Sequence, residues 1–160
     1  MKLLRTILSS AGIGALSLAA AGLTWLFVGP PDRSVFCNED ELEPGHVCLE
    51  TVRSWERGSH LWIDARPREL WEKNGVSGSV LLTDDNNEDY DLLFEGFMNA
   101  IFNGGDIFPH VVIYCNEAGC GSSKAIAEKL RNEVADELGF KVHILHGGWK
   151  ALADAEMILD

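Results

Sequence analysis

The sequence predicts an α/β domain in which helices cover both faces of a parallel sheet. Short apolar runs typical of buried strands alternate along the chain with stretches whose apolar residues follow helical spacing. Strands that alternate with helices pair in parallel, because each helix returns the chain to the same end of the sheet. Of the 160 residues, about 130 follow an N-terminal apolar stretch, enough for one hydrophobic core. We therefore expect one globular domain.

The N-terminal stretch has the features of a membrane helix. Residues 6–31 carry no charge, and the apolar run from Ile7 to Val28 is long enough to cross a bilayer. Lys2 and Arg5 precede it, whereas acidic residues dominate after it. The positive-inside rule then places the N-terminus in the cytoplasm and the domain on the periplasmic or extracellular side. A secretory signal cleaved after Ala19–Ala21 is the alternative.

This topology divides the chain into four parts. We expect a cytoplasmic N-terminus over residues 1–5, a transmembrane signal anchor over 6–28, a linker over 29–45 and the domain over 46–160.

The exported part of the chain is strongly acidic. The net charge of −12 becomes −14 when Lys2 and Arg5 are set aside. Such an acidic surface repels nucleic acid, so nucleic-acid binding is not expected. Cys37 and Cys48 precede the regular structure of an exported domain, where a disulfide between them is expected.

The expected elements follow in order. Pro67 suits the first turn of a helix that Gly75 ends, and the apolar stripe from Tyr90 to Phe102 has helical spacing typical of a core. Apolar residues at every fourth position from Ile126 to Leu138 indicate a further helix, with Gly139 as its C-cap. The strands are expected at residues 46–48, 61–64, 80–82, 111–114 and 141–145. Three helices are expected at residues 49–55, 67–75 and 90–102. Two further helices are expected, one from the loop after Cys115 to Leu138 and one from Gly147 onward.

The fourth strand ends at a cysteine that faces a helix N-terminus. Val111 to Tyr114 is a run of β-branched and aromatic residues, and Cys115 follows it directly. Ligands usually bind at such a point in α/β folds, because free backbone N–H groups and the positive end of the helix dipole converge there. A thiolate at this point is stabilised, so its pKa falls and its reactivity at neutral pH rises. Cys115 is therefore the candidate nucleophile.

Four motifs in sequence resemble the rhodanese-like family over about residues 46–156. They are Trp62-Ile63-Asp64-Ala65-Arg66, Gly78-Ser79-Val80, Tyr114-Cys115 with its loop, and Leu145-His146-Gly147-Gly148-Trp149. The resemblance implies a doubly wound α/β domain in which Cys115 carries sulfur as a persulfide. It implies no cofactor, and the partner would be a low-molecular-weight or protein thiol or persulfide. The loop amides that would surround the sulfur belong to Asn116, Glu117, Ala118, Gly119, Gly121, Ser122 and Ser123.

The resemblance also implies supporting residues. Asp64 and Arg66 match the family's Asp-x-Arg, and Glu69 matches the acid that follows it. We expect scaffold roles, with Arg66 paired to Glu69 three residues later and Asp64 supporting the loop. Gly147, Gly148 and Trp149 are interpreted as a tight turn and a core anchor, and His110, His143 and His146 as strand-end or surface residues.

The loop departs from the family pattern in its charge. Between Cys115 and Lys124 the only charged residue is Glu117, which raises a neighbouring thiol's pKa and repels anionic donors such as thiosulfate. A neutral or protein-borne persulfide is therefore the more suitable donor. Gly121 stands where the related Cys-x5-Arg phosphatases have their phosphate-binding arginine, which excludes phosphatase and arsenate chemistry.

Cys120 is the second departure, and it leaves several functions open. Five residues after Cys115, it could resolve a persulfide or sulfenic acid, form a permanent disulfide, or stay unpaired. A sulfurtransferase that uses a Cys115 persulfide is the first hypothesis. The others are a redox protein that cycles the Cys115/Cys120 pair, and a non-catalytic interaction module. A metal site is not expected, because Cys-x4-Cys is not a usual ligand spacing and no second pair follows.

Overall fold

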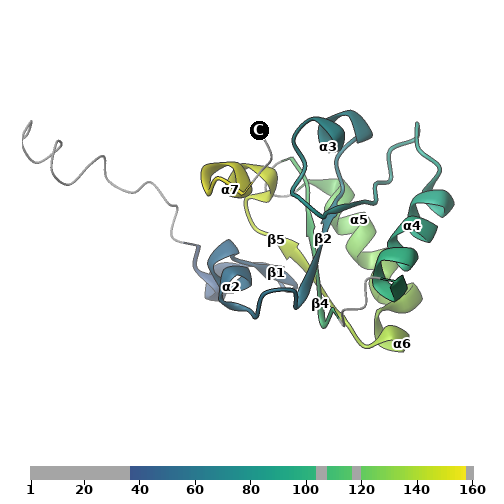
Figure 1. Cartoon of the computed structure of the whole chain (residues 1–160). Coiled ribbons are helices and arrows are strands. Elements are labelled where there is room, and N and C mark those ends of the chain that lie inside the picture. Colours follow the sequence, from purple (N-terminus) through teal and green to yellow (C-terminus); the bar gives the residue numbers. More distant parts are fainter. Residues whose placement is uncertain (1–36, 104–107, 117–119, 158–160) are drawn as a thin grey trace, which may run out of the picture. The chain divides into compact units, whose positions relative to one another are not determined.

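The computed structural model describes residues 37–103, 108–116 and 120–157, which form an α/β domain (Figure 1). Its sheet has five strands in the order β1-β5-β4-β2-β3, and every pairing is parallel. The strands are β1 (His46–Val47), β2 (His60–Asp64), β3 (Val80–Leu81), β4 (His110–Tyr114) and β5 (Lys141–Leu145). The expected parallel sheet is thus confirmed, with β4 at its centre.

Helices lie on both faces of this sheet. They are α2 (Leu49–Ser54), α3 (Arg68–Asn74), α4 (Tyr90–Asn103), α5 (Gly121–Leu130), α6 (Asp136–Leu138) and α7 (Gly148–Asp154), with a 3-10 turn η1 (Glu39–Glu41) and a π-helical turn η2 (Arg131–Ala135). The membrane helix expected over residues 6–28 lies outside the described residues. Within the ranges that the structure does describe, no helix is long and apolar enough to cross a bilayer.

The side chains of β4 are buried in two hydrophobic cores, one on each face of the sheet. Val111 and Ile113 point into a core with α4 and α5, whereas Val112 and Tyr114 point into a second core with α2 and α7. All four residues are fully buried, as expected when successive side chains alternate across a sheet covered on both faces. This arrangement places the C-terminal end of β4 in the middle of the domain, beside the start of α5.

The apolar row beyond α5 differs from the expectation at one turn. Ile126 and Leu130 are buried as expected, but Val134 is only half-buried and Ala135 takes the buried position. The backbone widens into a π turn over Arg131–Ala135, which advances the buried face by one residue. Gly139 then ends the helix in the left-handed conformation, with φ of 75°, which confirms it as the C-cap.

Candidate active site

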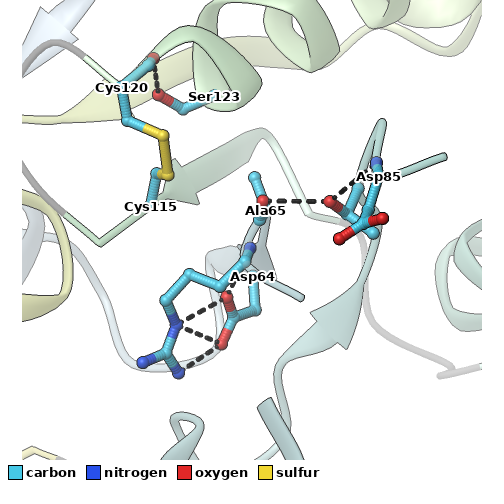
Figure 2. The surroundings of a disulfide bond; sticks show 8 residues. Asp64, Ala65, Asp85, Cys115, Cys120 and Ser123 are labelled. Atoms are coloured by element: carbon cyan, nitrogen blue, oxygen red, sulfur yellow. Dashed lines mark hydrogen bonds and ion pairs between the residues drawn. A yellow bond between two sulfur atoms is a disulfide. The ribbon is translucent and has the colours of Figure 1, made fainter. Parts of the chain in front are cut away.

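The site lies where β4 ends and α5 begins. Cys115 directly follows Tyr114, the last residue of β4, and Cys120 is the N-cap of α5. The two cysteines form a disulfide with an S–S distance of 1.94 Å and a Cα–Cα distance of 6.1 Å. Figure 2 shows this bond joining the tip of the strand to the helix. The pairing that the sequence left open is therefore made, and no cysteine of the chain is a free thiol.

The two sulfur-bearing residues differ in exposure and in how they are held. Cys115 is buried, with 5% of its surface exposed, and its carbonyl oxygen accepts a 2.6 Å hydrogen bond from the Trp149 N–H. Cys120 is half-buried, and its carbonyl oxygen accepts a 3.1 Å hydrogen bond from the buried hydroxyl of Ser123. The side chain of Cys120 makes no capping hydrogen bond to the amides of α5. Cys115 is thus the enclosed end of the disulfide and Cys120 the accessible end.

A buried ion pair lies near the end of β2. The guanidinium of Arg66 contacts the carboxylate of Asp64 through Nη2 at 2.6 Å and Nε at 2.9 Å, with both side chains almost fully buried. The expected partner of Arg66 was Glu69, and this prediction was wrong. Glu69 lies in the first turn of α3, whereas Asp64 also accepts the Arg66 backbone N–H at 2.9 Å and holds the guanidinium inside the domain. A buried charge needs such a directly hydrogen-bonded partner.

Aromatic rings enclose this ion pair and connect it to the disulfide. The Arg66 guanidinium carbon lies 5.5 Å from the centre of the Tyr114 ring and 5.3 Å from that of Trp149. The Trp149 indole N–H donates to the carbonyl oxygen of Asn74 at 3.0 Å, and Arg66 Nη1 donates to the Asn74 side-chain oxygen at 3.2 Å. Trp149 therefore contacts the ion pair through its ring and Cys115 through its main chain.

The remaining loop residues are only partly described. Glu117, Ala118 and Gly119 lie outside the described residues, while Asn116 and Gly121 are exposed. Gly121, Ser122 and Ser123 form the first turn of α5. The nearest downstream cation, Lys124, is exposed and lies 2.7 Å from the carboxylate of Glu43, whose pKa it lowers. Among the described residues no group of three or more His, Cys, Asp or Glu side chains could hold a metal ion.

The second disulfide confirms the expected pairing of Cys37 with Cys48. Their Cα atoms are 5.7 Å apart, and Cys48 is the buried N-cap of α2. The bond attaches the segment before β1 to the beginning of α2.

Sequence reasoning missed a histidine cluster that strands far apart in the chain bring together. His110 Nδ1 and His143 Nε2 are 3.1 Å apart, at hydrogen-bond distance, and the Trp55 ring stacks on His110 with 4.1 Å between centroids.

The pKa values of three histidines, His60, His110 and His143, are lowered in this cluster. Burial and the neighbouring charge of His110 lower the pKa of His60, and burial and Lys141 lower that of His110. Burial, His110 and Arg131 lower the pKa of His143 to about 4. The signal in the sequence was limited to His60 and His110, which each begin a strand and lie side by side because β2 and β4 pair in parallel.

Comparisons with solved structures and with a family model show what this chain is similar to. The structure of an As–Sb reductase from Leishmania major aligns with a TM-score of 0.52 and 15% identity, covering 71% of this chain and 83% of that one. A Bacillus halodurans protein aligns with a TM-score of 0.48 and 15% identity, covering 71% and 75% of the two chains. No curated protein matches the chain. The family model of the rhodanese-like domain matches residues 50–155. The chain therefore belongs to the rhodanese-like domain family.

Proposed function

We propose that this rhodanese-like domain is a thiol–disulfide exchange protein that works through Cys115 and Cys120. The proposal rests on the disulfide between Cys115, which follows β4, and Cys120, the N-cap of α5. In rhodanese-like domains the cysteine at this strand end is expected to be the reactive one, and here a second cysteine occupies its sulfur. A pair that can bond across a short loop can exchange with another thiol, if a thiolate reaches it.

The proposed cycle transfers two electrons. A partner thiolate attacks one sulfur of the pair, the Cys115–Cys120 bond breaks, and the other sulfur leaves as a thiolate. A second thiolate of the partner then attacks the mixed disulfide, which leaves the partner oxidised and both cysteines reduced. In the reverse sequence the reduced pair reduces a partner disulfide and the Cys115–Cys120 bond forms again. The partner we propose is therefore a low-molecular-weight or protein thiol.

Sulfur transfer through a Cys115 persulfide is the second candidate. It is favoured by the family match over residues 50–155 and by the place of Cys115 at the end of β4. In the disulfide state Cys115 has no thiolate and is 5% exposed, so it cannot accept a sulfur atom until the pair is reduced. Exchange therefore precedes any sulfur transfer. We retain a neutral or protein-borne persulfide, rather than thiosulfate, as the donor.

We also propose that the domain works on the exported side of a membrane, held by residues 6–28. The uncharged apolar run and its flanking charges support this location, and two disulfides are compatible with an oxidising compartment. Alkaline extraction of membranes tests the anchor: the chain should stay in the membrane pellet. Release into the supernatant would instead support a cleaved signal.

A redox titration of the full chain tests the exchange function. The protein is equilibrated in glutathione buffers of increasing reducing strength, alkylated, and digested for mass spectrometry. We expect the peptides of Cys115 and Cys120 to become alkylated together, at a buffer composition where circular dichroism shows a folded domain. If the pair resists reduction until the domain unfolds, it is a structural disulfide and the proposal is rejected. The Cys37/Cys48 peptides provide an internal comparison.

A further inference from the structure

We infer that Cys120, not Cys115, is the cysteine that exchanges with the partner, and that Cys115 is the enclosed leaving group. This inference deepens the proposed exchange function and rests on it. The family resemblance assigns the reactive role to the cysteine at the strand end. The surroundings of the two residues support the opposite assignment for this chain.

The two cysteines of the disulfide differ in their exposure to a partner. A thiolate must reach a sulfur atom directly to displace the other sulfur of the disulfide, so burial decides which one is attacked. Cys115 is 5% exposed, since it continues a strand whose last four residues are fully buried. Cys120, the N-cap of α5, is half-buried. The partner thiolate therefore meets Cys120 first.

Hydrogen bonds at the end of β4 restrain Cys115. The carbonyl oxygen of Cys115 accepts the Trp149 N–H, and the preceding carbonyl, that of Tyr114, accepts the Ala65 N–H at 2.9 Å. These two hydrogen bonds hold the backbone at the end of β4 to α7 and to the chain after β2. Turning Cys115 outward toward a partner would strain or break them. Cys115 is therefore placed to receive and release Cys120, not to contact a second protein.

Cys120 occupies the N-cap position of α5. An N-cap side chain usually accepts hydrogen bonds from the first amides of its helix, but in the disulfide Cys120 makes none. Once reduced, its sulfur would lie at the positive end of a helix of 10 residues, whose free amides stabilise a thiolate. The same position that exposes Cys120 to attack thus makes it the better nucleophile in the reverse direction.

The exchange proceeds in two displacement steps. The partner thiolate forms a bond to Cys120 Sγ, the Cys120–Cys115 bond breaks, and its electron pair leaves on Cys115 Sγ, which then takes a proton from solvent. The second partner thiolate attacks the partner's own sulfur in the mixed disulfide and expels the Cys120 thiolate. The partner loses two electrons, and the pair gains them.

Trapping the mixed disulfide tests this assignment. The oxidised full chain, in detergent, is exposed briefly to limiting reduced glutathione, quenched with acid, and mapped by mass spectrometry. We expect the glutathionyl group on Cys120. A glutathionyl group on Cys115, or equal amounts on both, would overturn the assignment while the exchange function stands. If neither cysteine is labelled and the pair stays oxidised, the exchange proposal fails as well.

Two single-cysteine variants give an independent rate comparison. Cys115→Ser leaves Cys120 free, and Cys120→Ser leaves Cys115 free, while the Cys37–Cys48 disulfide stays in both. We expect the thiol of Cys115→Ser to react with iodoacetamide at pH 7 at least about tenfold faster than that of Cys120→Ser, because it is more exposed and ionises more readily. Equal rates, or a faster Cys115 thiol, would contradict the inference. Circular dichroism of both variants shows whether the comparison is between folded domains.

Discussion

The main-chain N–H of Trp149 donates a 2.6 Å hydrogen bond to the carbonyl oxygen of Cys115, which joins the start of α7 to the disulfide loop. The same residue places its indole ring against the buried Arg66 guanidinium, at 5.3 Å, and donates its indole N–H to Asn74. One residue of α7 therefore supports both the disulfide and the ion pair.

Replacing Trp149 should cost stability in two separable steps. Trp149→Phe keeps an aromatic ring against Arg66 but loses the hydrogen bond to Asn74, and we expect a loss of about 1 kcal/mol. Trp149→Ala also loses the ring, and we expect the free energy of unfolding to fall by roughly 2–3 kcal/mol. This loss is smaller than for a fully buried tryptophan, because the side chain of Trp149 is only half-buried. Urea unfolding followed by circular dichroism measures both. Equal losses in the two variants would show that the ring contributes nothing.

Breaking the buried ion pair should be far more damaging than breaking an exposed one. Arg66→Leu leaves the Asp64 carboxylate buried and unpaired, with an expected loss of about 3–5 kcal/mol in the free energy of unfolding. Lys150→Ala is the matched control, because its 2.6 Å pair with Asp154 is largely exposed. We expect the control to change stability by less than about 0.5 kcal/mol. A tolerated Arg66→Leu substitution would refute the scaffold role of the pair.

The histidine cluster should make the domain sensitive to acid. The folded domain lowers the pKa of His143 to about 4 and lowers the pKa values of His60 and His110, so all three favour the neutral form. A histidine in the unfolded chain takes up a proton near pH 6.5. The stability that these histidines contribute is therefore complete above about pH 6.5 and declines as the pH falls toward about 4.

Urea unfolding at pH 7 and pH 5 measures this effect. We expect the wild-type domain to lose stability between the two values, and His143→Gln to lose less, because the variant has one such group fewer. His46→Gln is the matched control, because it removes a histidine that lies outside the cluster. An unchanged slope in His143→Gln would rule out His143 as a source of the acid sensitivity.

Removing the Cys37–Cys48 disulfide should affect stability but leave the redox behaviour of the loop pair intact. The two cysteines are 11 residues apart in sequence, and closing a loop of that size contributes about 2–3 kcal/mol. We expect the Cys37→Ser/Cys48→Ser double variant to unfold at a lower temperature. In the glutathione titration, Cys115 and Cys120 should be reduced at the same buffer composition as in the wild type. A shifted midpoint would show that the two disulfides are coupled.

Local sequence determined the elements of this domain. The run of Val111 to Tyr114 forms a strand because β-branched and aromatic side chains favour extended backbone, and Gly139 ends a helix because it adopts positive φ without strain. Both depend on residues within a few positions of one another, so both could be predicted from the chain alone. The place of Cys115 after a strand followed for the same reason.

Only the tertiary structure decided which residues meet and which are exposed. Arg66 was expected to follow helical spacing to Glu69, but burial makes the more enclosed Asp64 its partner. Likewise, His110 and His143 meet because β4 and β5 pair in parallel, a contact that no local pattern encodes. The exposure of Cys120 relative to Cys115 also depends on what packs over each residue. Short-range patterns determined what each segment becomes, and long-range packing determined the environment that sets its chemistry.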